Sequence, residues 1–231
     1  AHASGRRQQA GGLALRWRAA MLAPLLASRT EPARLSLEPP PPYFAQWESE
    51  ALIPEFLAGR DAASDPRWAD SGAATAEEYA RWAHHLCGMA CLRMAMAARG
   101  EDFTIHALRR AVQALGGYVE EPDGAIRGLI YAGAVAWLRG RGIPARILLD
   151  APLPALAPGQ LYIASVHARI RTPDLAPPHR GGHLVLLFGR DGEGRLRFHN
   201  PSGHSPETRR DARLRPEAFA RYHAGRGILI G

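Results

Sequence analysis

The strongest constraint on the fold of this chain is a predicted β-hairpin between residues 181 and 201. Two strand-like segments, residues 183–188 and 196–199, flank the dipeptide Asp191-Gly192. Asp-Gly is a strong signal for a two-residue hairpin turn, because both of its positions require positive φ. We therefore expect an antiparallel sheet to form around this hairpin.

The predicted turn also sets the register of the two strands. Residues whose numbers sum to 383, as 191 and 192 do, then lie opposite each other, so Val185 faces Phe198 on an apolar side. The other side pairs Leu186 with Arg197 and is predicted to be more exposed.

In this register His183 lies directly opposite Asn200, with Cβ atoms about 5 Å apart. The amide oxygen of Asn200 could then accept a hydrogen bond from the imidazole, which fixes the ring as a general base requires. Without Cys87, the pair is better interpreted as a His and an Asn that merely end two strands.

Helices are predicted before the strands along the chain. Thr75 and Glu78 have the spacing of a capping box, and Thr104 is placed to cap another helix. Beyond the helix that follows Thr75, we expect helices over residues 87–99, 105–115 and 126–139, and a short one that begins at Pro216. Strands are expected over residues 145–149, 161–166, 183–188, 196–199 and 227–230. Helices over about residues 75–140 and mostly antiparallel strands over about 144–231 indicate an α+β protein.

The four consecutive prolines at 39–42 mark a boundary, since such a run forms neither helix nor central strand. We expect an N-terminal extension over residues 1–38 and one domain over 39–231. The apolar stretch at 13–26 is interrupted by Arg and Pro and makes a poor signal peptide. Localisation is left open: the cytoplasm is favoured, and secretion fits if a signal peptide has been removed.

Charge argues against a nucleic-acid partner in spite of a net charge of +7. All 29 basic residues are arginines, scattered along the chain with no run longer than two, whereas nucleic-acid binders gather basic residues on one face. An acidic partner or substrate remains compatible with such a surface. No apolar run approaches the length that crosses a membrane, so we expect no membrane partner. Oligomeric state is not indicated.

The chain has two cysteines, Cys87 and Cys91, four positions apart in a predicted helix, where disulfide geometry is poor. Cys87 lies at the start of this helix, where the dipole and the free N–H groups favour the thiolate, the nucleophilic form. Cys91 falls one turn further on and is interpreted as a core residue.

Three short motifs occur in a set order: Cys-Gly at Cys87, Gly-His at His183 and Asn-Pro at Asn200. Over about residues 39–231 they resemble the C39-like branch of the papain-like cysteine peptidases. The resemblance implies a papain-like fold, with the nucleophile on a central helix packed against a mostly antiparallel sheet. It implies that Cys87 is the nucleophile, His183 the base and Asn200 its orienter. Such an enzyme cleaves a peptide or amide bond through an acyl-enzyme.

The resemblance also assigns Gln46, in the segment 42–47, as the oxyanion donor, a role worth on the order of 3 kcal/mol. Two departures from the family pattern stand out. About forty residues separate Gln46 from Cys87, and we expect the inserted segment, 48–86, to contain a helix and to fold over the cleft. Asn200 stands where this branch more usually has Asp.

Two other functions would use the same residues. An acyl or amide transferase needs the same triad, and only an amine competing with water in a product assay separates it from a hydrolase. A peptide-binding module that does not cleave is the other, although it would have no need of an intact Cys, His and Asn.

A metal site is the remaining alternative. The chain contains no paired Cys-x-x-Cys or His-Glu-x-x-His, and adjacent histidines on a helix diverge by about 100 degrees. We therefore expect neither metal nor cofactor. The residues that could otherwise have been metal ligands are His84, His85, Cys87, Cys91, His199 and His204.

Overall fold

The computed structural model describes residues 36–231, so most of the predicted extension, including the stretch at 13–26, lies outside the described residues. Within this range the α-helices are α1 (Ile53–Leu57), α2 (Ala76–Ala83), α3 (Cys87–Ala97), α4 (Ile105–Gln113), α5 (Tyr131–Gly140), α6 (Pro206–Arg209) and α7 (Pro216–Ala220). The strands are β1 (Ala145–Leu148), β2 (Leu161–His167), β3 (Gly182–Arg190), β4 (Leu196–His199), β5 (Ala212–Leu214) and β6 (His223–Ile230). Short 3-10 helices are η1 (Glu50–Leu52), η2 (Ala62–Ser64), η3 (Trp68–Ser71) and η4 (Ala168–Arg171). The predicted α+β class is confirmed.

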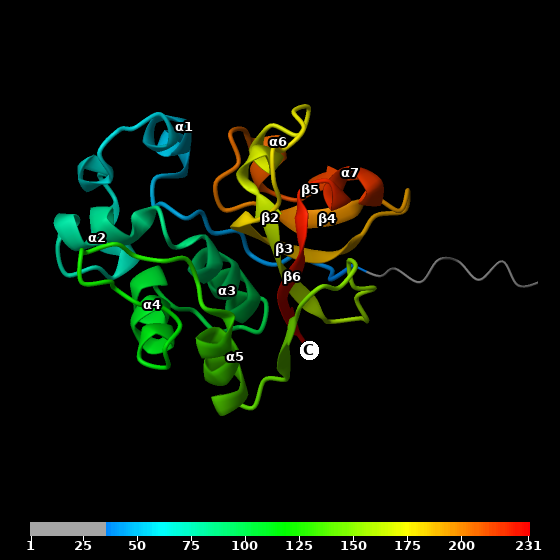
Figure 1. The fold of residues 1–231 in the computed structure, drawn as a ribbon, viewed down its shortest axis with the longest axis horizontal. Helices are drawn as coiled ribbons and strands as arrows, with labels where there is room; N and C mark the ends of the chain where they lie inside the picture. The colour runs from blue at the N-terminus through cyan, green and yellow to red at the C-terminus, as the bar shows by residue number, and fades with distance from the viewer. Residues whose placement is uncertain (1–35) are drawn as a thin grey trace, which may run out of the picture. The chain divides into compact units, whose positions relative to one another are not determined.

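The six strands form one sheet in the order β1-β6-β2-β3-β4-β5, and every neighbouring pair is antiparallel. One face packs against α3 and α5, and α4 packs on these two helices; the three lie together beside the sheet in Figure 1. The other face carries a second apolar cluster that includes Phe219 of α7. Because both faces are covered, the central strands β2 and β3 are buried along almost their whole length.

Two of the predicted helix starts are confirmed by their caps. Thr75 Oγ1 accepts a hydrogen bond from Glu78 N at 3.1 Å, and Thr104 Oγ1 accepts one from Ala107 N at 3.3 Å. The helix predicted over 126–139 begins later, at Tyr131. Ile130, just before it, instead donates its N–H to Gly117 O at 2.9 Å. The sequence also did not predict β5, α1 or α6.

The hairpin forms, but its predicted register is wrong. The loop has three residues rather than two: Asp191 N donates to Arg195 O at 2.9 Å, and Gly194 takes the left-handed conformation at φ 77°. Leu187 consequently lies opposite Phe198, two positions away from the predicted pairing, and a bulge follows Leu187. Before the bulge the shift is two residues, which keeps Leu186 and Leu187 on their predicted faces.

The side of the hairpin predicted to be more exposed is buried. Leu186 and Phe188 are 0% and 1% exposed, since α3 packs over them. Arg197 on the same side is also buried, and its guanidinium pairs with Asp211 at 2.8 Å.

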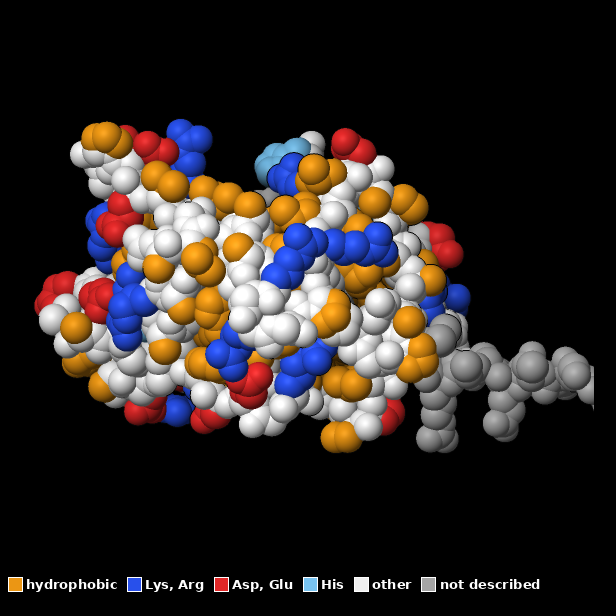
Figure 2. All heavy atoms as spheres, turned by 90° about the horizontal axis from the view of Figure 1, so that it is seen from below, with side chains coloured by type: hydrophobic (Ala, Val, Ile, Leu, Met, Phe, Trp, Pro, Cys, Tyr) orange, Lys and Arg blue, Asp and Glu red, His pale blue; other side chains and the backbone are white. Residues whose placement is uncertain are grey.

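Two properties of the whole molecule bear on its partners. In the described part of the chain, no helix is long and apolar enough to span a membrane. Figure 2 shows one face of the molecule, on which arginine side chains are interspersed with hydrophobic, neutral and acidic ones. On that face the excess positive charge is therefore dispersed rather than gathered into one continuous patch.

Candidate active site

Cys87 occupies the first position of α3, where the N–H groups of the first turn have no partners within the helix. Gly88 lets this end of the helix approach the sheet closely: a Cβ on it would lie 2.7 Å from Leu129 Cδ2 and 2.9 Å from Leu184 Cδ1. The Cys87 sulfur lies near the backbone N–H groups of Leu184, Gly88 and Cys87 itself, which favour the thiolate. The starts of α3 and of β3 together surround the sulfur.

His183 is hydrogen-bonded to Asn200 even though the hairpin register differs from the predicted one. The imidazole is buried, and its Nε2 atom lies 2.8 Å from Asn200 Oδ1. The same oxygen accepts the backbone N–H of Ser202 at 3.2 Å, so the amide oxygen, not the NH2 group, faces the ring. An oxygen can only accept, so His183 Nε2 carries the proton and Nδ1 is left able to accept one. This is the tautomer that a general base requires.

Asn200 is itself held by its backbone. Its N–H donates to the Arg209 carbonyl at 2.8 Å, and its carbonyl accepts from the Tyr43 hydroxyl at 3.1 Å. The side chain is fully buried. The orienting oxygen is therefore placed by a rigid segment rather than by a free strand end.

Cys87 and His183 line one cleft, which has a volume of about 280 Å³. Its other walls include Leu129, Tyr131, Ser165, Leu184 and Arg226. The predicted nucleophile, base and orienter thus lie together. They come from three separate parts of the chain: α3, β3 and the segment after β4.

Burial controls the protonation of the pair. It raises the pKa of the Cys87 thiol, and the nearby backbone N–H groups and the charge of Arg171 only partly offset it. Burial, helped by the same Arg171 charge, lowers the pKa of His183 to about 3. The sequence predicts correctly that the helix start favours the thiolate, but the larger effect of burial leaves a neutral thiol beside a neutral imidazole.

Gln46 lies beside the site, but its side chain is engaged elsewhere. Its backbone N–H donates to Pro201 O at 2.9 Å, next to Asn200, while its side-chain Nε2 donates to Ala83 O at 2.7 Å. Gln46 is not among the residues that line the cleft with Cys87. One amide hydrogen remains available on Nε2, so the predicted role of oxyanion donor stays a prediction.

The inserted segment 48–86 packs into a small core of its own, with Trp47, Phe56 and Tyr79 at its centre. Asp65 holds this core together, since its carboxylate accepts from the Tyr79 hydroxyl at 2.6 Å and from Ser49 N at 3.1 Å. Among the described residues that line the cleft, none comes from 48–86. The expected helix is present as α2, whereas a cover over the cleft is not seen.

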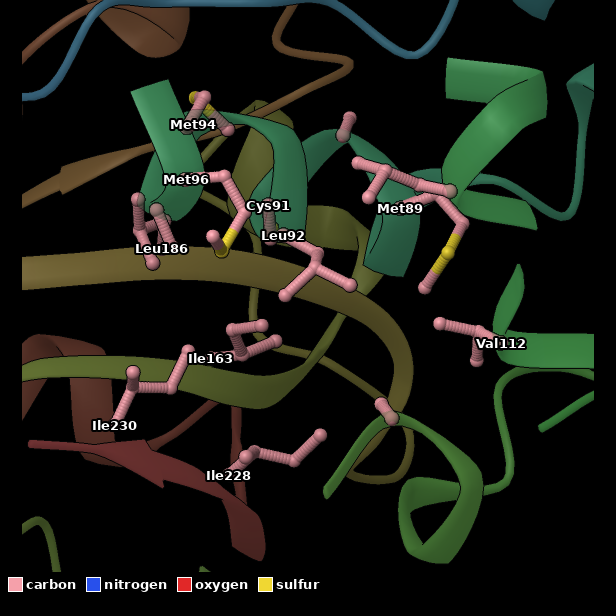
Figure 3. Close-up of a cluster of buried hydrophobic side chains, with 14 of the residues drawn as sticks. Met89, Cys91, Leu92, Met94, Met96, Val112, Ile163, Leu186, Ile228 and Ile230 are labelled. Atoms are coloured by element: carbon pink, nitrogen blue, oxygen red, sulfur yellow. The ribbon is translucent and has the colours of Figure 1, made fainter. Parts of the chain in front are cut away.

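Cys91 is fully buried in the main core. Figure 3 shows Cys91 within the cluster of buried hydrophobic side chains that also contains Leu186 of β3. Burial raises its pKa well above that of an ordinary thiol. The two cysteines therefore differ as the sequence predicts, with Cys91 placed as a core residue.

The proposed alternative of a metal site finds no support in geometry. Residues 36–231 contain no group of three or more His, Cys, Asp or Glu placed to hold an ion. His199, one of the candidates, uses both ring nitrogens: Nε2 lies 2.8 Å from Pro41 O, and Nδ1 accepts from Asp211 N at 3.0 Å.

Sequence reasoning missed two residues of the site, Ser202 and Arg171. Ser202 Oγ lies 3.3 Å from His183 Nε2 and accepts a hydrogen bond from Arg171 Nε at 2.9 Å. Ser202 stands two residues after Asn200 and could have been suspected from that position. Arg171 is one of 29 basic residues, and nothing local distinguishes it.

Comparison with known proteins adds no relative. No family model matches the chain, and no curated protein matches it.

Proposed function

We propose that this protein is a papain-like thiol hydrolase that cleaves a peptide or amide bond through an acyl-enzyme on Cys87. The observation that carries the proposal is the bond between His183 Nε2 and Asn200 Oδ1, beside a cleft that His183 shares with Cys87. A buried histidine whose tautomer is set in this way, next to a cysteine at a helix start, is the arrangement that nucleophilic catalysis needs.

The neutral resting pair determines how the reaction begins. His183 Nδ1 accepts the thiol proton as the sulfur attacks the substrate carbonyl carbon, so the thiolate forms only when it is consumed. The oxyanion that develops meets the free N–H groups at the start of α3, each donor worth on the order of 3 kcal/mol. The imidazolium then protonates the leaving amine, and water hydrolyses the thioester with His183 again acting as base.

The first test uses a substrate that makes no demand on specificity. p-Nitrophenyl acetate should acetylate Cys87, detected by mass spectrometry, and should turn over in the wild type and in Cys91→Ala. Cys87→Ala and His183→Ala should leave only the buffer rate. His85→Ala is the matched control, because it removes a histidine two positions from the nucleophile and should keep the rate.

Two outcomes would contradict the proposal. Equal loss in Cys87→Ala and Cys91→Ala would point to a structural role for both cysteines. Acetylation of Cys87 that does not depend on His183 would mean that the imidazole is not its base.

A further inference from the structure

One wall of the cleft that contains Cys87 carries polar side chains that the proposed reaction does not use. In the described part of the chain, the only permanently charged side chain that lines this cleft is Arg226 of β6, and no carboxylate lines it. Ser165 of β2 lines the same cleft. An anionic group of a ligand would therefore meet a positive charge in the cleft and no opposing negative one.

A bulge in the sheet brings these two residues together. Between two regular pairs of β2 with β6, β2 contributes the single residue Ser165, whereas β6 contributes the three residues 224–226. Gly225, in the middle of the bulge, has a φ of 69°, and its carbonyl accepts from Ala151 N at 2.9 Å. Bulges redirect side chains and recur beside active sites. Here the bulge places Arg226, its last residue, at the cleft next to Ser165.

The backbone just before His183 contacts both polar groups. Gly181 has a φ of 91°, a conformation that favours glycine. A Cβ built on Gly181 would lie 3.0 Å from Arg226 Nη2 and 3.5 Å from Ser165 Oγ. The guanidinium and the hydroxyl therefore approach the same point of the chain, two residues before the base.

Ser165 and Arg226 are both available to a ligand. Ser165 is 2% exposed and lines the cleft, and within residues 36–231 its hydroxyl makes no hydrogen bond. A buried hydroxyl is costly to leave unpaired, so a ligand that accepts a hydrogen bond from it is favoured over one that does not. Arg226 is exposed, and it forms no ion pair with a carboxylate of the described residues. Neither side chain has to give up a partner when a ligand binds.

We propose that Arg226 and Ser165 form a subsite that binds a carboxylate of the substrate in the cleft beside Cys87. One carboxylate oxygen accepts from a guanidinium N–H of Arg226, and the other accepts from the Ser165 hydroxyl. The inference rests on the proposed function and narrows its substrates to peptides or amides with a carboxylate close to the bond that is cleaved. Hydrogen bonds to a charged acceptor are about twice as strong as neutral ones, so the subsite discriminates an acid from its amide.

The test uses two pairs of fluoromethyl ketones, in which the sulfur of Cys87 displaces fluoride beside a ketone. Acetyl-Asp-Ala-fluoromethyl ketone is compared with its Asn analogue, and acetyl-Ala-Asp-fluoromethyl ketone with its own Asn analogue. The rate of alkylation of Cys87 is measured for each reagent at pH 7 and low salt by mass spectrometry. We expect one Asp reagent to react about tenfold faster than its neutral analogue, the effect of one charge-assisted hydrogen bond. High ionic strength should reduce this preference.

Arg226→Gln should bring the ratio of the two rates to about one, while Arg226→Lys should keep part of the preference because the charge remains. Ser165→Ala should lower the ratio about threefold. Arg180→Gln is the matched control, since it removes the same charge from an exposed position next to Gly181 that does not line the cleft. A preference unchanged in Arg226→Gln would overturn the inference. An equal loss in Arg180→Gln would also overturn it, because the cause would then be the general positive field.

The neutral reagents separate this inference from the proposed function. If the Asn analogues label Cys87 as fast in His183→Ala as in the wild type, the proposed function fails. If labelling depends on His183 but the ratio does not depend on Arg226, only the carboxylate subsite fails.

Protection experiments distinguish a side-chain carboxylate from a terminal one. Acetyl-Ala-Ala carries a terminal carboxylate, and acetyl-Ala-Ala-amide carries none. Stronger slowing of Cys87 labelling by the first peptide, lost in Arg226→Gln, supports the inference and assigns the terminal carboxylate, whereas a preference for an Asp reagent assigns the side chain. If neither the reagents nor the peptides show a preference that depends on Arg226, the inference is overturned.

Discussion

Replacing Asn200 by Ala tests the part of the site that was inferred first. The substitution removes the oxygen that accepts from His183 Nε2 at 2.8 Å and from Ser202 N at 3.2 Å. A neutral hydrogen bond contributes about 1 kcal/mol net, and the loss of two such bonds around the base corresponds to about 1–2 kcal/mol. Because Ser202 Oγ, 3.3 Å from Nε2, remains as a weaker acceptor, the imidazole keeps part of its orientation.

The rate of iodoacetamide labelling of Cys87 at pH 7, read by mass spectrometry, should therefore fall by about 5- to 30-fold in Asn200→Ala. It should stay above the rate in His183→Ala, which lacks the base altogether. Circular dichroism of each variant establishes that the fold is intact. Ser202→Ala is the matched control, since it removes only the longer contact and should lower the rate less.

Labelling of Cys87 at the wild-type rate in Asn200→Ala would refute the reasoning, because the orientation of His183 would then not depend on this side chain. A rate as low as that of His183→Ala, in a folded variant, would show that Asn200 does more than orient the ring.

Three further predictions concern the core and its pH dependence. Cys91→Ala should lower the free energy of unfolding in urea by about 1–2 kcal/mol and leave labelling of the other cysteine unchanged; slower labelling would contradict its place as a core residue. Gly88→Val should destabilise the fold by about 1–3 kcal/mol and slow labelling, since the added atoms meet the sheet; a variant as stable as the wild type would contradict this. Burial lowers the pKa of His183 to about 3 and the pKa values of His106 and His223 to about 4. In the unfolded chain each of these rings takes up a proton below about pH 6.5, whereas in the folded protein it stays neutral to a lower pH. The free energy of unfolding is therefore highest above about pH 6.5 and falls as the pH is lowered toward 4. Urea unfolding from pH 7 to 5 should show a loss of about 1.4 kcal/mol per pH unit for each protonating ring, and a flat profile would disprove the assignment.

Local chemistry explains what the sequence determined by itself. Thr75 and Thr104 predict where their helices begin, because a helix N-cap needs only a side-chain hydroxyl and the backbone N–H three residues later. The alternation of side chains along the hairpin places His183 and Asn200 on one face. An error of two residues in the predicted register leaves both residues on that face. The helical position of Cys87 likewise depends on neighbours along the chain.

Only the tertiary structure decided the rest. Of two glycines in the turn, Gly194 rather than Gly192 takes the left-handed conformation, a choice that depends on how β3 and β4 pack. Burial of the second hairpin face requires α3 to be packed on it, and no pattern within the hairpin indicates that partner.

The protonation state of the site was also decided by the tertiary structure. Desolvation of Cys87 and His183 arises from segments far apart in the chain, and it outweighs the helix-start effect that the sequence predicts. Sequence determines which groups are present and which face each occupies, whereas burial and the charges that meet across the fold exist only once the chain is packed.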